Sequence, residues 1–392
     1  MQAGESDDSP GTPAPCEVTI VAHDVGSVGG MERQLAELIT GLRRLGHDVT
    51  VIARTCELPD GTEVRFHRVR GPRRPFLLFY PWFMLAGSLA VRRWRRGVVQ
   101  ATGAIVVNRV DSVAIHCCHQ VYRATPTRAT RLFRLNVAFG GLVKRAAERM
   151  CIRANRNAAI VCVSEGVAEE MREHYPQAAE RVMTIHNGVD TETFAPGAHT
   201  QAARALRAKL GIGEQRLVVA FVAREWGHKG LQAVIEALAL APDWDLAVAG
   251  TGDRERYRAL ADSIGVGEVV RWLGLVREIP VVYAMADAFV LPSNYETFSL
   301  VTFEAAASAL PVLATPVSGV RELIRDGENG FVIAAEAQSI ADRLNELAHD
   351  PALRQRIGAA ARQSALRFTW DDAVAKHHEL YERLASRSAR QG

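Results

Sequence analysis

Short apolar runs alternate with amphipathic segments along most of this chain of 392 residues. The runs are rich in Val, Ile and Ala, which is typical of strands buried in a parallel sheet. The strands predicted in this way lie at 17–23, 49–53, 63–69, 103–107, 113–118, 159–163 and 182–185, and then at 217–222, 245–249, 269–272, 288–291, 311–314 and 330–333. Helical spacing predicts helices at 31–45, 230–240, 253–263, 278–285, 319–325, 370–386 and around Glu304. This regular alternation predicts an α/β fold.

The chain is too long for one ordinary hydrophobic core, and its two series of strands predict two doubly wound, Rossmann-like domains. Asn-Gly and Pro punctuate residues 187–196, which sets the predicted domains at 16–195 and 196–368. The last residues, 369–392, are expected to form a helix that packs back on the first domain. Residues 1–15, rich in Ser, Asp, Pro and Gly, predict a disordered leader that lacks the apolar stretch of a signal peptide. Because ligands of such sheets bind at the carboxyl ends of strands, the site is predicted in a cleft between two facing domains.

Composition adds the compartment and the solubility class. Apolar residues make up 48% of the chain and charged residues 23%, which indicates a soluble globular protein. None of the cysteines has metal-ligand spacing, so they predict reduced thiols in a cytosolic protein. They are Cys16, Cys56, Cys117, Cys118, Cys151 and Cys162.

The net charge of +3 conceals a strongly basic window. Residues 54–156 hold 20 Lys and Arg against 5 Asp and Glu. Inside the window, the apolar segment 76–91 leads into the Arg-rich segment 92–96 and is too short to span a bilayer. An interfacial helix on anionic lipid and a buried helix with a solvated basic end both remain open. Nucleic acid is not expected as a partner, because no reader motif accompanies the charge.

Glycines and cations follow several predicted strands. The loop with Gly26, Gly29 and Gly30 does not match a dinucleotide fingerprint, so it is either a close backbone approach to a ligand or an ordinary tight turn. Arg224 and Lys229 stand between the predicted strand and helix that open the second domain. A guanidinium and an ammonium at this place favour phosphate binding. Turns at 250–252 and 273–276 are suited to a nucleotide base and ribose.

Two glutamates eight residues apart, Glu296 and Glu304, follow the predicted strand 288–291. If one helix carries both, they lie on nearly one face and could meet one extended polar ligand. The alternative is that both are solvated helix residues. An anionic group would be favoured at the start of this helix, by the amides of Phe298, Ser299 and Leu300.

Taken together and in order, these segments resemble glycosyltransferase family 4, retaining enzymes of the GT-B fold, over nearly the whole chain. The matching segments are Gly29-Gly30-Met-Glu-Arg33, His119 at the end of Ala114-Ile-His-Cys-Cys-His119, Val163-Ser164-Glu, Asn187-Gly-Val-Asp190, Arg224 with Lys229-Gly230, and Glu296 with Glu304 and the later Pro311-Val.

The resemblance implies a role for each polar residue. Arg224 and Lys229 would hold the donor diphosphate and neutralise the charge that grows on it. Glu304 would bind ribose hydroxyls, and Glu296 would contact the donor sugar. His119 would lie beside the anomeric centre, as a sugar-positioning residue or as a general base.

Further donor contacts are implied along the backbone. Gly29 and Gly30 would let the first domain approach the phosphates. Val276, with Arg277 and Glu278, would border the base, and the amides of residues 298–300 would orient sugar and phosphate. The family more often has glycine where Thr297 and Ser299 stand, so the identity of the donor sugar stays open.

The resemblance implies a retaining hexosyltransferase that uses a nucleoside-diphosphate sugar, with uridine favoured over guanosine. No Asp-x-Asp motif lies beside the site, so transfer without a metal and without a cofactor is expected. The acceptor could be carbohydrate, lipid-linked, membrane-associated or a small secondary metabolite. The expected location is cytoplasmic, with peripheral attachment to the inner face of the plasma membrane as an option. Another GT-B chemistry, such as a sugar-nucleotide epimerase or phosphorylase, and a catalytically silent binding subunit are the alternatives.

Overall fold

The computed structural model of the chain describes residues 15–27, 29–72, 75–122 and 131–390. These residues form two compact units. One contains the described residues up to Ala114, with Ala146–Ile160 and the residues from Ala373 onward. The other contains Ile115–Arg145 and Val161–Asp372.

The first sheet has seven strands in the order β5-β3-β1-β6-β7-β8-β9. The pairs β3-β1, β1-β6 and β6-β7 are parallel, as expected from the apolar runs. Its strands are β1 Glu17–Val21, β3 Asp48–Ala53, β5 Arg65–Arg68, β6 Val98–Thr102, β7 Ser112–Ile115, β8 Ala159–Cys162 and β9 Val182–Thr184. The short strands β2 Asp24–Val25 and β4 Thr55–Cys56 form a separate parallel pair.

The strand predicted at 103–107 is wrong, because the strand at this place is β6, which ends at Thr102. Gly103 has a φ of +77°, and the chain leaves the sheet there. The backbone beyond it bonds to helix α2 (Phe76–Trp94) instead: the Tyr80 hydroxyl donates to the Ala104 carbonyl at 2.6 Å, and the Val107 amide donates to Ser88 Oγ at 2.9 Å. Ile105 and Val106, between these two contacts, are buried. The apolar pattern of this segment therefore reflects burial and not pairing with a neighbouring strand.

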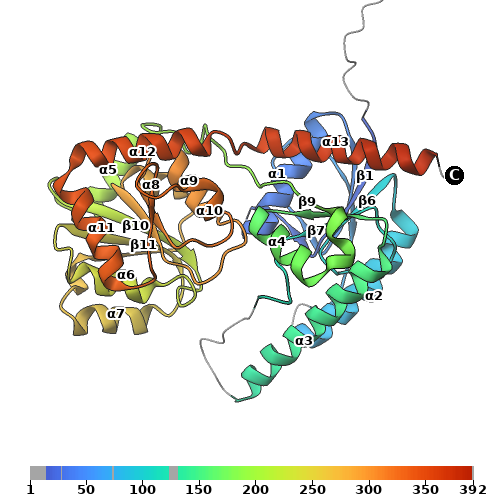
Figure 1. Ribbon diagram of the computed structural model, residues 1–392, viewed down its shortest axis with the longest axis horizontal. Helices are drawn as coiled ribbons and strands as arrows, with labels where there is room; N and C mark the ends of the chain where they lie inside the picture. Colours follow the sequence, from blue (N-terminus) through green and yellow to red (C-terminus); the bar gives the residue numbers. More distant parts are fainter. Residues whose placement is uncertain (1–14, 28, 73–74, 123–130, 391–392) are drawn as a thin grey trace, which may run out of the picture. The chain divides into compact units, whose positions relative to one another are not determined.

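The second sheet has six parallel strands in the order β12-β11-β10-β13-β14-β15, and all six predicted strands are confirmed. The strands are β10 Leu217–Arg224, β11 Trp244–Thr251, β12 Val270–Gly274, β13 Ala288–Leu291, β14 Val312–Ala314 and β15 Phe331–Val332. Figure 1 shows α5, α8, α9 and α12 above this sheet and α6 and α7 below it, which is a doubly wound arrangement.

The helices of the described residues include all seven that helical spacing predicts, with ends shifted by a few residues, and others that it does not predict. They are α1 Gly30–Arg44, α2 Phe76–Trp94, α3 Arg131–Ala154, α4 Glu165–His174, α5 Thr200–Lys209, α6 Leu231–Leu238, α7 Arg254–Ser263, α8 Ile279–Ala284, α9 Leu300–Ala307, α10 Val320–Leu323, α11 Ala337–His349, α12 Pro351–Ala365 and α13 Trp370–Ala389, with 3₁₀ turns at Pro176–Arg181 and Gly267–Val269. Within the described ranges, none of these helices has the length and apolarity needed to cross a bilayer. All six cysteines are free thiols.

Helix α13 packs on α1 within the first unit. A Cβ placed on Gly41 would lie 2.3 Å from Val374 Cγ2, so the two helices approach as closely as a glycine allows. His47 Nε2 lies 2.8 Å from His378 Nδ1 in the same interface, and both rings are buried.

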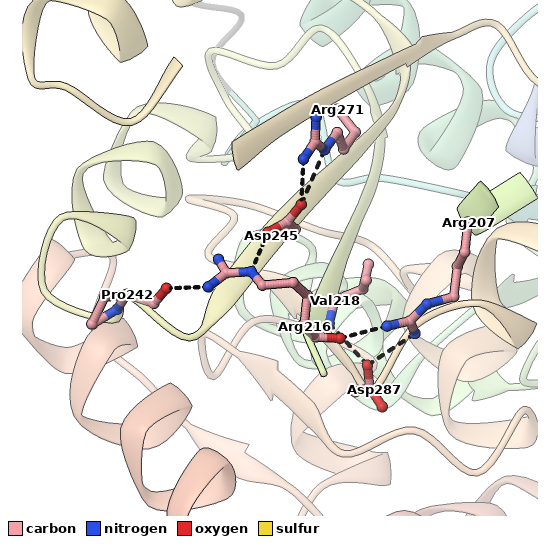
Figure 2. A network of polar contacts seen from close by, with 7 residues as sticks. All are labelled: Arg207, Arg216, Val218, Pro242, Asp245, Arg271 and Asp287. Atoms are coloured by element: carbon pink, nitrogen blue, oxygen red, sulfur yellow. Dashed lines mark hydrogen bonds and ion pairs between the residues drawn. The ribbon is translucent and has the colours of Figure 1, made fainter. Parts of the chain in front are cut away.

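A buried carboxylate ties together the amino ends of the second sheet's strands (Figure 2). Asp245 is 1% exposed and accepts hydrogen bonds from Arg216 Nε at 2.8 Å and from Arg271 Nη2 at 2.8 Å. Beside it, Arg207 bonds to Asp287, which also accepts from the Val218 amide at 2.9 Å. These contacts lie at the sheet edge opposite the one where ligands of such folds bind.

Replacing Asp245 with Ala is expected to lower the free energy of unfolding by about 3 kcal/mol, because two guanidinium groups lose their buried counter-ion. Chemical denaturation measures this change. Asp243→Ala, at an exposed position just before the same strand, is the control and should change stability little. Equal stability of the two variants would show that the network does not stabilise the sheet.

Candidate functional site

A charge pair joins the loops that follow two neighbouring strands, β10 and β13. Lys229 Nζ donates to Glu296 Oε1 at 2.6 Å, and Ser293 Oγ donates to the same oxygen at 2.8 Å. The Glu296 side chain is 9% exposed and that of Lys229 is 26% exposed. Because the strands are parallel neighbours, their carboxyl ends bring together two residues that are far apart in sequence. The sequence-predicted pair Lys229 and Glu296 is therefore assembled in the structure.

The two loops are held against each other by their backbones. Gly230 has a φ of +78°, and a Cβ there would lie 2.4 Å from the Pro292 carbonyl oxygen. The Asn294 amide donates to the His228 carbonyl at 3.1 Å. Glycine is therefore required next to Lys229, both for its dihedral angles and for the close approach.

Helix α9 begins immediately after this pair. Its N-cap is Ser299, whose φ of +68° is in the left-handed region, and its Oγ lies 2.8 Å from Thr302 Oγ1. Phe298 is buried and stacks on Phe303 with ring centroids 4.1 Å apart. Leu300 is the first helical residue and Ser299 the N-cap, so Phe298 lies just before the helix; the role of the amides of residues 298–300 toward an anionic group stays a prediction. The dihedral angle of Ser299 explains why glycine suits this position.

The prediction that Glu296 and Glu304 share one helix face is wrong. Helix α9 starts at Leu300, so Glu296 lies before the helix and Glu304 little more than one turn inside it. Glu304 is 2% exposed, and its Oε2 accepts from the Tyr283 hydroxyl at 3.2 Å. Both carboxylates thus lie near the start of α9, Glu296 in the preceding loop and Glu304 in the helix itself.

Arg224 and Lys229 stand at the two ends of the loop between β10 and α6. Arg224 is the last residue of β10 and is exposed, and Glu225 after it has a φ of +57°. Trp226 anchors the middle of the loop, because its buried indole Nε1 donates to the Ala223 carbonyl at 3.0 Å.

A pocket of about 300 Å³ lies beside this loop and the predicted turn at 250–252. Its lining includes residues 225–227 of the loop and Thr251 and Gly252 of the turn. Val276 is half-buried between β12 and α8, and Glu278 is exposed at the N-cap of α8. The base-binding roles of Val276 and Glu278 stay predictions.

His119 follows β7 and is half-buried. Its Nδ1 lies 3.3 Å from Cys117 Sγ. Burial, with smaller effects from the positive charges of Lys144 and Arg145, lowers the pKa of His119 to about 4. The imidazole is therefore neutral at pH 7, so it can hydrogen-bond to a hydroxyl but is a weak base.

Tyr122 is a candidate that the sequence did not reveal. Its ring centroid lies 5.4 Å from that of Tyr295, the residue before Glu296. Burial raises the pKa of Tyr122, with further contributions from the negative charges of Glu225 and Glu296. Tyr295 in turn donates its hydroxyl to Glu170 Oε2 at 3.1 Å. The segment that carries His119 thus brings an aromatic ring toward the loop of Glu296.

Gly29 and Gly30 lie in the first unit, at the start of α1. Gly29 has a φ of +109° and forms the N-cap, and Gly30 is the first helical residue. A side chain on Gly29 would overlap the Glu32 carboxylate, with Cβ 2.1 Å from Oε2. The turn therefore needs glycine for its own geometry, and its role toward phosphates stays a prediction.

Folding stability is expected to fall as the pH is lowered from about 6.5 to about 4, because burial lowers the pKa of both His116 and His119 to about 4. In this window the unfolded chain binds protons that the folded protein does not, so acid favours unfolding. Denaturation series at several pH values measure the slope. His119→Gln should make it shallower, and the exposed His174→Gln should not. The same slope in wild type and His119→Gln would contradict this expectation.

The fold and this site define a two-domain Rossmann-like protein of the GT-B class, and comparisons with known proteins agree. Residues 203–364 match the family "Glycosyl transferases group 1", and residues 28–193 match "Glycosyltransferase Family 4". Together the two matches span most of the chain, and they confirm the resemblance to glycosyltransferase family 4.

Relatives and solved structures give the same picture. A D-inositol 3-phosphate glycosyltransferase of Streptomyces bingchenggensis is 28% identical over 91% of this chain and 85% of its own length. The protein of that name from Corynebacterium aurimucosum is 34% identical over 57% of each chain. The chain thus spans little more than half the length of the corynebacterial relatives it matches.

Two solved structures support the fold. WaaG, described as a glycosyltransferase involved in lipopolysaccharide biosynthesis, has a TM-score of 0.77 at 21% identity, over 92% of this chain and 98% of its own. Anabaena Alr3699/HepE in complex with UDP-glucose has a TM-score of 0.71 at 20% identity, over 92% and 99%. At these identities the likeness concerns the fold alone.

Proposed function

We propose that this chain transfers a hexose-type sugar from a nucleoside-diphosphate sugar to an acceptor hydroxyl, with retention at the anomeric carbon and without a metal ion. The observation that carries the proposal is the Lys229–Glu296 pair, held at the carboxyl ends of β10 and β13 beside the start of α9. Family membership supports the transferase class.

In the proposed reaction, the glycosidic bond to the donor diphosphate breaks and negative charge grows on the leaving phosphate. Arg224 and Lys229 take up this charge, and the amides at the start of α9 add fixed dipoles. Glu296, already aligned by Lys229 and Ser293, contacts the hydroxyls of the sugar. The leaving phosphate accepts the proton of the acceptor hydroxyl on the same face of an oxocarbenium-like sugar, which gives retention.

His119 is assigned to the sugar and not to proton abstraction. A group with a pKa of about 4 is a poor general base near pH 7. A neutral imidazole can instead donate or accept one hydrogen bond to a sugar hydroxyl. Of the two roles that the sequence leaves open, we therefore propose the positioning role.

The proposed donor is a uridine diphosphate sugar. The solved structure of HepE with UDP-glucose supports uridine among proteins of this fold. Glu304, bonded to Tyr283, is proposed to hold the ribose, and Val276 and Glu278 to border the base. The phosphate approach by Gly29 and Gly30 belongs to the same proposal.

For the acceptor, two classes are supported by different observations. The apolar, aromatic and Arg-rich segment 76–96 of the first unit favours a lipid-linked or membrane-associated acceptor, and WaaG, a protein of the same fold, is described as involved in lipopolysaccharide biosynthesis. The names of the relatives favour a small phosphorylated cyclitol as the second candidate. A cytoplasmic location agrees with either acceptor and stays a prediction.

The test is incubation of the purified protein with UDP-, GDP- and ADP-sugars, with and without chelator, in the presence of each acceptor class. Released nucleoside diphosphate and product mass report transfer, and NMR of the product reports the anomeric configuration. Transfer with retention that is indifferent to chelator is expected. No nucleotide release from any donor, or activity that depends on added Mg²⁺, would overturn the proposal. A sugar-nucleotide epimerase would instead convert the donor without an acceptor.

A further inference from the structure

Helix α2 presents an apolar stripe to solvent. Leu78, Trp82, Leu85 and Leu89 follow each other at helical spacing, and they are 62%, 48%, 60% and 60% exposed. The opposite face packs into the first unit through Tyr80, Phe83, Gly87, Ser88 and Val91. The helix is therefore neither wholly buried nor an ordinary amphipathic surface helix, because its solvent face is as apolar as its core face.

This stripe is not interrupted by charge. No charged residue occurs from Pro75 to Val91, so the exposed leucines have no charged neighbours along the helix. Contiguous exposed apolar surface of this kind marks a surface that another body covers. Residues 1–14 are mostly polar and small, so they do not supply an apolar segment that would cover it.

The surroundings of the stripe are strongly basic. The helix ends in Arg92 and Arg93, and Arg95 and Arg96 follow, all four of them exposed. No Asp or Glu occurs anywhere from residue 64 to residue 110. Trp94 lies among these arginines, stacked on His67 with ring centroids 4.3 Å apart and covered by the Arg93 guanidinium at 4.8 Å.

We propose that α2 docks this protein on an anionic lipid surface, lying in the interface plane with the four stripe residues (Leu78, Trp82, Leu85 and Leu89) in the acyl boundary and the arginines at the headgroups. Aromatic and aliphatic side chains beside Arg suit this boundary. Lipid phosphates complement the basic rim, and each basic residue near such a surface adds to binding.

A second copy of the chain fits the same face less well. A twofold dimer would place each basic rim near the other, because an isologous contact uses the same patch twice. Nothing acidic lies in residues 64–110 to compensate. Charge complementarity therefore selects the lipid surface.

The test is co-sedimentation of the full chain with vesicles of phosphatidylcholine containing phosphatidylglycerol, without donor or acceptor. Wild type should sediment with the anionic vesicles and much less with pure phosphatidylcholine. Leu85→Asp/Leu89→Asp should weaken binding by about 10-fold or more, and Arg92→Ser/Arg95→Ser should weaken binding to anionic vesicles to a similar extent. Leu240→Asp, at an exposed leucine of the second unit, is the matched control and should bind like wild type.

A second measurement keeps the test sharp. The contribution of Trp82 to the fluorescence is the difference between the wild type and Trp82→Phe. Brominated lipid should quench this contribution in the wild type. Absence of vesicle binding by the wild type, or equal binding by the Leu85/Leu89 variant, would overturn the proposal. The proposal would also be overturned if light scattering showed that the wild type is a dimer and that Leu85→Asp/Leu89→Asp is a monomer. In that case a second copy of the chain covers the apolar stripe of α2. Since vesicle binding needs no turnover, its failure is distinguishable from a failure of the proposed transfer.

Discussion

Lys229→Ala and Glu296→Ala are each expected to lower turnover by about 10²-fold or more while the protein stays folded. Lys229 is proposed to neutralise the leaving diphosphate, and this contact is worth most when the charge has developed. Glu296 fixes the ammonium through the 2.6 Å contact and is proposed to meet the donor sugar. Steady-state kinetics with donor and acceptor measure the loss, and thermal unfolding checks the fold.

The pair should also behave as one unit. The double variant Lys229→Ala/Glu296→Ala is expected to be about as slow as the slower single variant, because each change already removes the contact. Lys209→Ala, at the exposed end of α5, is the control and should keep the wild-type rate. Near-wild-type turnover in both single variants would refute the assignment, whatever their stability.

Much of the second sheet could be predicted from the sequence. Its strands are short apolar runs bounded by polar and glycine-containing turns, and the four inner strands β10, β11, β13 and β14 are largely buried on both faces, so burial and strand formation coincide there. The loops that carry Lys229 and Glu296 could be placed for the same reason. They follow strands that are neighbours in a doubly wound sheet, and such strands end at one edge.

The parts that were missed depend on tertiary contacts. Ile105 and Val106 are buried like strand residues, but their segment bonds to α2 through Tyr80 and Ser88. The apolar pattern cannot distinguish these two ways of burying a backbone. Tyr122 was missed because its neighbour Tyr295 lies in a distant part of the sequence, and no local motif links them.

The prediction that Glu296 and Glu304 share one helix face is wrong for a different reason. Helical periodicity does not extend across Ser299, because its backbone has a φ of +68° and the helix begins only after it. Such a dihedral angle in a residue other than glycine leaves no clear sequence signal. The resemblance holds a signal that was not used in this way, because glycine is more common at this position in the family.

Gly319→Ala is expected to lower the free energy of unfolding by about 3 kcal/mol or more, well beyond the usual effect of a single methyl group. Gly319 has a φ of +77°, and a Cβ there would lie 2.2 Å from the Phe298 carbonyl oxygen. The new methyl group must therefore push the backbone that precedes Ser299 and α9. Since this backbone is proposed to orient sugar and phosphate, the donor KM should rise as well.

Gly327→Ala is the matched control, because Gly327 has a φ of +74° and open space around its Cβ position. It should cost only about 1 kcal/mol, the strain of a left-handed alanine, and should leave the donor KM unchanged. The difference between the two variants isolates the close approach to Phe298 from the dihedral strain that both share. If Gly319→Ala and Gly327→Ala had equal stabilities and equal donor KM values, the turn at Gly319 would not support the start of α9.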